Sequence, residues 1–223
     1  MIYILLDEAP KEVFTLKGEL FKYIVKVRRH TTGESVYFRS KDDLAILHKC
    51  EILSIDNRTL TLKLLSSELQ EVKAENKLHI GWCIIDSKSI EKVLPTLSEI
   101  GVEKITFIEC ERSQKNFKLD FNRFKRILEA SMQQCGRSSF IEFERSVSLK
   151  SFLEEHPQAR VFDFCDSVLD ERADFQVVLV GCEGGFSDAE RKLFENFETF
   201  RLKTPMVLRS ESAVVALSSK ILL

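Results

Sequence analysis

The stretch VGCEGGFSDAE, residues 180–190, holds three of the eight glycines of this 223-residue chain. It continues the apolar run VVLV and leads into a segment that starts like a helix. A glycine-rich turn between a strand and a helix often holds a phosphate, because the helix N-terminus offers free N–H groups. The spacing G-x-x-G-G, however, fits neither the Walker A pattern nor the dinucleotide fingerprint. The stretch therefore indicates an α/β fold with a ligand loop of another kind.

Acidic side chains within this stretch also argue against a phosphate ligand. Glu183 lies among the amides that would have to hold the anion, and its carboxylate would repel it. Ser187 and Glu190 form the S-x-x-E pattern of a capping box, which satisfies the first helical amides with the helix's own side chains. The glycines are then expected to allow close backbone approach or positive φ. The loop suits a neutral or cationic ligand.

A second stretch, PMVLRSESA at residues 205–213, ends an apolar run in charged and hydroxyl side chains. Ser210 or Ser212 is a candidate N-cap for the helix of small residues that follows. Capping does not account for Arg209, since its charge opposes the positive end of the helix dipole. Arg209 and Glu211 can therefore be catalytic residues of one site, or they can hold the chain together as an ion pair.

The chain around these two stretches alternates between strand and helix patterns, which is typical of an α/β domain with a largely parallel sheet. Expected strands are 78–86, 102–110, 159–165 and 175–181, and expected helices are 89–101, 120–136, 148–156 and 187–197. The run VVLV is apolar throughout, as a parallel strand buried on both faces should be.

Two of the expected helices carry clear end signals. In the helix 89–101, Val93, Leu97 and Ile100 are expected on one face, Gly101 fits the C-terminal cap, and Pro95 weakens or kinks the helix. In the helix 120–136, Asp120 is the expected N-cap and Gly136 the expected left-handed residue at the C-terminal end. The expected buried face consists of Phe121, Phe124 and Leu128.

The first 70 residues show a different sequence pattern. Short β-type runs recur between polar turns, at 3–6, 35–40, 44–55 and 59–65, and this spacing predicts a small barrel. One segment departs from it: in 18–30, Leu20, Ile24 and Val27 recur as one face of an α-helix would. The polar stretch 67–77 fits a linker. We therefore expect two domains, 1–70 and 71–223.

Composition narrows the class of protein. Hydrophobic residues make up 44% and charged residues 30%, which suits a globular chain with a real core. No run approaches the roughly 18 apolar residues of a membrane span, and the N-terminus does not read as a signal peptide. Six cysteines without a CxxC pair and four scattered histidines favour a cytoplasmic protein without a metal site or a disulfide framework. Each cysteine is expected to be a small buried hydrophobe.

Positive charge is concentrated in two places, although the net charge is only −2. The first cluster comprises Lys22, Lys26, Arg28 and Arg29. The second, residues 112–137, carries seven basic side chains against two acidic ones and includes Arg112, Lys115 and Arg137. Such patches can follow the phosphates of a nucleic acid, or they can be ordinary solvated faces.

The motifs together resemble a known family. V-G-C-E-G-G-F-S-x-x-E is similar to the G-P-E-G-G-[FL]-S-x-x-E loop of the SPOUT methyltransferases that modify N3 of uracil in 16S ribosomal RNA, the RsmE-type family. P-M-V-L-R-S-E-S-A resembles its R-[IV]-L-R-[ST]-E-[TS]-A motif. Weaker matches in the same order are C-E-R-S, F-K-L-D, E-A-S-M-Q-Q-C-G-R, S-E-I-G-V and I-V-K-V-R-R-H-T-T-G-E.

The sequence departs from the family pattern at a few positions. Cys182 replaces the usual proline, and Thr204 and Met206 replace a glycine and the first arginine of the second motif. Thr96, Asp86 and Ser87 also differ from the usual residues. These departures concern cofactor affinity and RNA contact, while Arg209 and Glu211 are intact.

The resemblance implies a fold, a cofactor and a set of partners. It implies a PUA-like β-barrel followed by a trefoil-knotted α/β domain, a homodimer, S-adenosyl-L-methionine (SAM) as methyl donor, and 16S ribosomal RNA or the small ribosomal subunit as substrate. The donor carries a sulfonium and an ammonium, which agrees with a loop that contains Glu183. The residues expected to contact the donor are Val180, Gly181, Cys182, Glu183, Gly184, Gly185, Leu202, Met206, Val207, Leu208, Ser210 and Ser212.

Roles for the remaining residues follow as hypotheses. Arg209 would stabilise charge that develops on the uracil, and Glu211 would orient Arg209 or accept the N3 proton. The two basic clusters, Lys22, Lys26, Arg28 and Arg29 with Arg112, Lys115 and Arg137, would contact RNA. Three alternatives stay open: methylation of a ribose 2′-hydroxyl, a non-catalytic RNA-binding module, and a Rossmann-type nucleotide enzyme.

Overall fold

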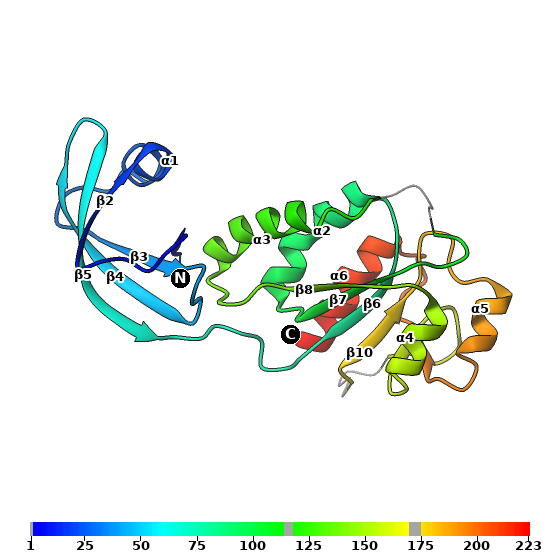
Figure 1. Cartoon of the computed structure of the whole chain (residues 1–223). Helices are drawn as coiled ribbons and strands as arrows, with labels where there is room; N and C mark the ends of the chain where they lie inside the picture. The colour runs from blue at the N-terminus through cyan, green and yellow to red at the C-terminus, as the bar shows by residue number, and fades with distance from the viewer. Residues whose placement is uncertain (1, 114–117, 170–174) are drawn as a thin grey trace. The chain divides into compact units, whose positions relative to one another are not determined.

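The computed structural model describes residues 2–113, 118–169 and 175–223, so Lys115 lies outside the described residues. The chain divides into two compact units (Figure 1). The first comprises Met1–Lys73 together with Met132–Ser139, and the second comprises Ala74–Ser131 and Phe140–Leu223. The short segment 132–139 thus belongs to the first unit although it lies far along the chain.

A five-stranded mixed sheet forms the first unit. Its strands are β1 (Ile4–Leu6), β2 (Val13–Lys17), β3 (Ser35–Ser40), β4 (Ile46–Ile55) and β5 (Thr59–Leu69). The spatial order is β1-β3-β4-β5-β2, with β1 parallel to β3 and every other pair antiparallel. Alternate side chains of the long strands, among them Ile52, Leu60 and Leu62, are fully buried in one core. Closure of this sheet into a PUA-like barrel stays a prediction.

The helical segment of this unit differs from the α-helix expected over 18–30. One turn, α1 (Gly18–Phe21), runs into a π-helix, η1 (Lys22–Val27). The wider π turn shifts each later side chain around the axis relative to an α-helix. Ile24 is therefore buried as expected, whereas Val27 is 66% exposed and does not share its face. The expectation for Val27 was wrong because an i, i+4, i+7 pattern assumes α-helical winding.

The second unit is an α/β layer structure around a six-stranded parallel sheet. Its strands are β6 (His79–Cys83), β7 (Lys104–Ile108), β8 (Glu142–Ser146), β9 (Arg160–Phe162), β10 (Val177–Val180) and β11 (Thr199–Phe200), in the order β11-β9-β10-β6-β7-β8. All of these pairs are parallel, and every residue of β10 is buried. The predicted parallel sheet with a doubly covered VVLV strand is confirmed.

Helices cover both faces of this sheet. They are α2 (Ser87–Ile100), α3 (Phe121–Cys135), α4 (Leu149–Glu155), α5 (Asp188–Leu193) and α6 (Ser210–Leu222) (Figure 1). Successive residues of β6 show the two faces, because side chains alternate along a strand. Gly81 faces α4 so closely that a Cβ there would lie 2.3 Å from the Phe152 ring. Trp82 points to the other face, where its indole N–H donates to Ser210 of α6 at 2.8 Å.

The end signals of α2 and α3 are largely confirmed. Gly101 caps α2 at φ 107°, Asp120 accepts from the Arg123 amide at 3.0 Å, and Gly136 follows α3 at φ 89°. The expected buried face of α2 was partly wrong. Its buried apolar side chains are Ile90, Leu94 and Leu97, while Val93 and Ile100 are only half-buried.

Two cysteines are paired, contrary to the expectation that each is a small buried hydrophobe. Cys83 and Cys110 form a disulfide, with their Cα atoms 5.9 Å apart. Cys83 ends β6 and Cys110 follows the adjacent strand β7, so the parallel pairing of these strands brings the two side chains together. Sequence separation concealed this pairing, because no short Cys-x-x-Cys motif marks it. The other four cysteines are free.

Two further properties of the described residues bear on function. No helix in the described ranges is long and apolar enough to cross a membrane. Within the same ranges, no cluster of three or more His, Cys, Asp or Glu side chains could hold a metal ion.

Candidate functional site

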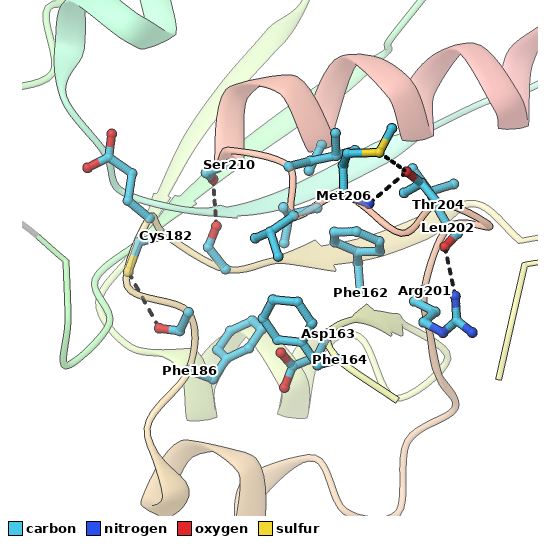
Figure 2. A pocket seen from close by; sticks show the side chains of 17 residues that line it. Phe162, Asp163, Phe164, Cys182, Phe186, Arg201, Leu202, Thr204, Met206 and Ser210 are labelled. Atoms are coloured by element: carbon cyan, nitrogen blue, oxygen red, sulfur yellow. Dashed lines mark hydrogen bonds between the residues drawn. The ribbon is translucent and has the colours of Figure 1, made fainter. Parts of the chain in front are cut away.

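A cavity lies where β9 and β10 end, at the carboxyl edge of the parallel sheet (Figure 2). Loops after the strands of such a sheet are the usual place for a ligand. The cavity measures about 130 Å³. It is lined by Phe162, Asp163, Phe164, Val180, Gly181, Cys182, Glu183, Gly185, Phe186, Arg201, Leu202, Thr204, Met206, Val207, Leu208, Ser210 and Ala213. The two stretches singled out in the sequence therefore form walls of the same cavity.

Every residue expected to contact the methyl donor lines this cavity except Gly184 and Ser212. Gly184 sits under Arg112, whose guanidinium donates to the Gly184 carbonyl at 2.8 Å, and Ser212 is exposed on α6. The two predicted stretches therefore line one cavity, and their contact with the methyl donor stays a prediction.

The first wall, residues 180–186, is fixed by hydrogen bonds on both sides. The predicted capping box at the start of α5 is present, since Ser187 and Glu190 bond each other's main-chain N–H groups. The second oxygen of Glu190 accepts from the Glu111 amide at 2.8 Å. A single buried carboxylate therefore ties the loop after β10 to the loop after β7. Gly185 takes a positive φ of 65°, which explains one glycine of the pattern.

Ser210 connects the first wall to the helix α6. Its hydroxyl donates to the Gly181 carbonyl at 2.6 Å (Figure 2). The same hydroxyl accepts from the Trp82 indole at 2.8 Å. The expected capping roles of Ser210 and Ser212 were wrong. The N-cap of α6 is Arg209, which makes no side-chain cap bond. Ser210 is buried among the strand ends, so its hydroxyl serves tertiary contacts instead of the helix start.

The second wall, residues 201–208, is held more loosely. Thr204 donates its amide to the Leu202 carbonyl at 2.9 Å and accepts from the Met206 amide at 3.2 Å (Figure 2). Met206 and Val207 expose 67% and 76% of their surface. The main-chain N–H groups of Val207 and Leu208 make no hydrogen bond to any described residue. This wall offers free amide donors and apolar surface to a ligand.

Cys182 takes the place of the usual proline in the first wall. Its thiol is nearly buried and donates to the Gly185 carbonyl at 3.6 Å (Figure 2). Burial raises the pKa of this thiol, so it stays protonated and is a poor nucleophile at neutral pH. Cys182 therefore acts as a spacer within the turn.

Aromatic and charged residues after β9 complete the cavity and were missed in the sequence. Asp163 and Phe164 line it, and Figure 2 shows both between Phe186 and the second wall. Asp163 is buried and binds Arg191 of α5 through two hydrogen bonds, at 2.8 and 3.3 Å. Phe164 is 71% exposed. The only available signal was a polar residue directly after an apolar strand, which is too common to select them.

The two residues expected to be catalytic differ in their surroundings. Arg209 is exposed, whereas Glu211 is half-buried in the first turn of α6. One carboxylate oxygen of Glu211 is buried without a hydrogen-bond partner among the described residues. The described residues show no ion pair between Arg209 and Glu211. An unpartnered buried oxygen is costly, and such groups occur where a ligand or proton completes them.

The residues expected to contact RNA fall into separate places. Lys22, Lys26, Arg28 and Arg29 lie in and just after η1 of the first unit. Arg112 lies beside the cavity, where it bonds Gly184. Arg137 is only 7% exposed, and its Nε donates to the Ser139 hydroxyl at 3.3 Å. RNA contact by Arg137 stays a prediction, and the burial of its side chain counts against it.

Residues 72–222, which include the second unit except for its last residue, match a family model described as an RNA methyltransferase domain. The whole chain is 37% identical over 215 residues to ribosomal RNA small subunit methyltransferase E of Helicobacter pylori strain 26695, covering 95% of each chain. The corresponding protein of H. pylori strain J99 is 35% identical over the same shares. The chain belongs to this methyltransferase family.

Solved structures agree with this assignment. A methyltransferase from Legionella pneumophila, solved with bound SAM, superimposes with a TM-score of 0.75 at 25% identity, over 98% of this chain and 95% of that one. Ribosomal RNA small subunit methyltransferase E from Neisseria gonorrhoeae, also bound to SAM, gives a TM-score of 0.74 at 18% identity over the same shares. At that lower identity the likeness establishes the fold alone.

Proposed function

We propose that the chain transfers a methyl group from SAM to N3 of a uridine in the 16S ribosomal RNA of the small subunit. The observation that carries this proposal is the cavity at the carboxyl edge of the sheet. Both motifs of the RNA methyltransferase family meet in it, one as each wall. The close relatives are named for methylation of small-subunit ribosomal RNA, and the target atom follows from the motif resemblance.

The chemistry of the cavity fits the donor. Phe162, Val180 and Ala213 give it apolar surface for the adenine ring. The free N–H groups of the second wall can donate to ring nitrogens. Arg201 lines the cavity, and its guanidinium donates to the Cys165 and Leu202 carbonyls, at 2.9 and 3.3 Å. These neutral partners fix its position but leave its charge, so the cationic sulfonium is expected to lie away from Arg201 and towards Glu183 of the first wall.

The cavity is also small for the whole donor. Pockets for ligands of this size commonly measure about 300–1,000 Å³, so about 130 Å³ encloses only part of it. The remainder has to lie at the mouth, where Phe164, Met206 and Val207 are exposed. The loosely held second wall can close over it without breaking the hydrogen bonds of the first wall.

Transfer to N3 requires that the nitrogen lose its proton, because the lone pair of the protonated imide is a poor nucleophile. Bound SAM supplies an electrophilic methyl group; the N3–carbon bond forms as the carbon–sulfur bond breaks. The proton needs an acceptor within reach. The unpartnered carboxylate oxygen of Glu211 suits this role, and exposed Arg209 suits stabilisation of the anionic uracil. Since the two are not paired with each other, each is free for a separate task.

Several features implied by the resemblance belong to the same proposal. They are a trefoil knot through which the segment from β11 to α6 threads, a PUA-like barrel in the first unit, and a homodimer. Direct packing of α6 against α2 and β10 is consistent with a C-terminal segment built into the sheet.

Product analysis tests the reaction. Small subunits from a strain that lacks the gene are incubated with the purified chain and isotopically labelled SAM, and the digested RNA is analysed by mass spectrometry. Label on the base of one uridine, at N3, is expected. Label on a ribose would instead establish 2′-hydroxyl methylation.

A calorimetric titration separates the remaining alternatives. SAM is expected to bind, and NAD and ATP are expected to give no heat. A chain that binds RNA but not SAM is a binding module, and that result would contradict the proposal.

A further inference from the structure

A second cleft lies in the first unit, remote in sequence from the methyl-donor motifs. It measures about 280 Å³ and is bounded by β1, β3 and the end of η1. Its lining residues are Ile2, Ile4, Tyr23, Arg28, His30, Ser35, Val36 and Tyr37. It combines an apolar floor, two tyrosines and basic side chains, whereas the pocket beside Phe21 and Ile55 in the same unit has no tyrosine. We call it the η1 cleft.

An unusual backbone builds one wall of the η1 cleft. In η1 the Arg28 amide donates to the Tyr23 carbonyl at 2.9 Å, the five-residue step of a π turn. In an α-helix residues three and four apart share a face, so Tyr23 and Arg28 would point apart. Here the Arg28 guanidinium carbon lies 5.3 Å from the centre of the Tyr23 ring, and its Nε donates to the Tyr23 hydroxyl at 2.9 Å. Arg28 is thereby held against the Tyr23 ring and its hydroxyl.

The next residue also has an uncommon conformation. Arg29 is the only described non-glycine residue with a positive φ, at 60°. Left-handed conformations of such residues store strain and concentrate at binding sites. Arg28 is the C-cap of η1, so the positive φ of Arg29 turns the chain directly after the helix ends.

Polar groups of the η1 cleft are available for a ligand. The Tyr37 hydroxyl makes no hydrogen bond to any described residue, although the side chain is half-buried. His30 bonds Glu34 at 2.8 Å, and that contact lowers the pKa of Glu34 together with the Thr31 amide, the larger cause. Glu34 is thus engaged, and no acidic side chain is among the described residues that line the cleft.

Positive charge at the η1 cleft comes from Arg28, which lines it, and from Arg29, which is next in the chain, whereas Lys26 lines another pocket of the unit beside Asp56. Lys22 is paired with Glu19 at 2.7 Å. By contrast, Lys26, Arg28 and Arg29 make no ion pair with any described residue. Unpaired cations next to flat, apolar surfaces are the combination that single-stranded nucleic acids bind, since phosphates need cations and bases need planes.

We propose that the η1 cleft holds one unpaired nucleotide of an RNA strand. The base lies against the planar Arg28 and Tyr37 side chains, above the floor of Ile4 and Val36, and a neighbouring phosphate lies near Arg29. A base inside a duplex cannot enter, because its faces are covered by stacked neighbours. This inference rests on the proposed function only in taking RNA as the substrate.

Fluorescence anisotropy with the full-length chain tests the inference. The probes are a labelled oligouridylate of about a dozen nucleotides, within the span of such binding sites, and a paired RNA duplex of equal length. Arg28→Lys keeps the charge but loses the planar group. Tyr37→Leu removes the other plane. Lys63→Ala changes an exposed side chain of β5 outside the cleft and is the matched control.

Each cleft variant is expected to weaken oligouridylate binding about tenfold, the cost of losing one base stack, and to leave duplex binding unchanged. Lys63→Ala is expected to change neither. Equal losses for strand and duplex, or competition by polyglutamate as strong as by RNA, would show that only charge matters and would overturn the inference. SAM titration and thermal unfolding of each variant confirm that it is folded.

A covalent readout gives a second test. A strand containing 4-thiouridine should cross-link on irradiation to the peptide that contains Tyr23 or the one that contains Tyr37. Cross-links confined to other peptides would contradict the placement. If the chain methylates uridine and Arg28→Lys changes neither strand binding nor methylation, this inference is wrong and the proposed function stands. If strand binding depends on Arg28 but the chain methylates no uridine, the inference stands and the proposed function is wrong.

Discussion

The two edges of the parallel sheet in the second unit are built on opposite principles. At the amino edge, His79 bonds Thr106 at 2.8 Å, Thr106 donates to Glu144 at 3.1 Å, and Lys104 pairs with Glu144 at 2.6 Å. Each side chain in this chain of contacts has at least one polar partner. At the carboxyl edge, amides of the second wall and one oxygen of Glu211 have none among the described residues.

The difference separates stability from function within one sheet. A fully paired polar cluster contributes to folding and leaves no group available for a ligand. Unpaired groups cost stability and are retained where a ligand completes them. Changes at the amino edge should therefore alter folding and spare donor binding, while changes at the carboxyl edge should alter binding or turnover. Four predictions test this separation.

The largest expected effect is on turnover. Arg209→Ala removes an exposed carboxyl-edge cation that makes no ion pair within the described residues. We expect kcat to fall by about 10²–10³-fold, as when one charge-stabilising group is lost, with the donor dissociation constant and the melting temperature unchanged. Single-turnover methylation and calorimetry measure these. Lys203→Ala, an exposed cation on the same loop, is the control. Turnover at the wild-type rate would remove Arg209 from the mechanism.

At the amino edge, we expect His79 to make the free energy of unfolding depend on pH without changing donor binding. Burial, with the charges of His156 and Lys104, lowers the pKa of His79 from 6.5 to about 4, and Glu144 opposes the shift. The unfolded chain therefore takes up a proton near pH 6.5 that the folded chain refuses. Stability is full above pH 6.5 and falls as the pH drops towards 4, by up to about 3 kcal/mol.

His79→Gln keeps a donor and acceptor near Thr106 but does not titrate. Denaturant unfolding at pH 7.5 and pH 5 should show a smaller loss for the variant than for the wild type. A residual loss remains, because burial also lowers the pKa of His156 and of His48. Identical pH dependence of the two proteins would contradict the role of His79, and a changed donor affinity at pH 7.5 would break the separation between the edges.

Ser210 is a position where one substitution should affect both folding and donor binding. Its hydroxyl is buried and joins Trp82 to Gly181, so it serves both the core and the first wall. Ser210→Ala leaves an indole N–H and a carbonyl unpaired, which costs about 2 kcal/mol. We expect a lower free energy of unfolding together with weaker SAM binding. Ser212→Ala, exposed on the same helix turn, should change neither. Loss of stability with unchanged donor affinity would limit Ser210 to the core.

Local patterns in the sequence revealed most of the carboxyl edge. The glycine at 185, with its positive φ, and the capping box at 187–190 are short-range signals, because one arises from backbone conformation and the other from side chains three residues apart. The alternation of strands and helices likewise predicted the parallel sheet. These features could be read from the chain because each is determined within a few residues.

Features that depend on distant partners could not be read in this way. Trp82 and Ser210 are 128 residues apart, and only the folded sheet brings them together. The same holds for the disulfide of Cys83 and Cys110, which depends on the register of β6 and β7. The η1 cleft escaped for another reason: a π turn has no sequence signature that separates it from an α-helix, so the juxtaposition of Tyr23 and Arg28 was invisible.

The smallest expected effect concerns Cys182, where the family usually has proline. The Cys182 amide makes no hydrogen bond to any described residue, so proline removes none there. Proline would restrict the free chain and pre-form the first wall, a gain of about 0.4–1 kcal/mol, or roughly two- to fivefold tighter SAM binding. Cys182→Ala is the control, since it removes the thiol without restricting φ. If Cys182→Pro and Cys182→Ala change the SAM dissociation constant by the same factor, the change comes from loss of the thiol contact to Gly185 and not from restricted backbone freedom. If proline weakens binding, the first wall must adjust when the donor enters, and the contrast between a fixed first wall and a yielding second wall is wrong.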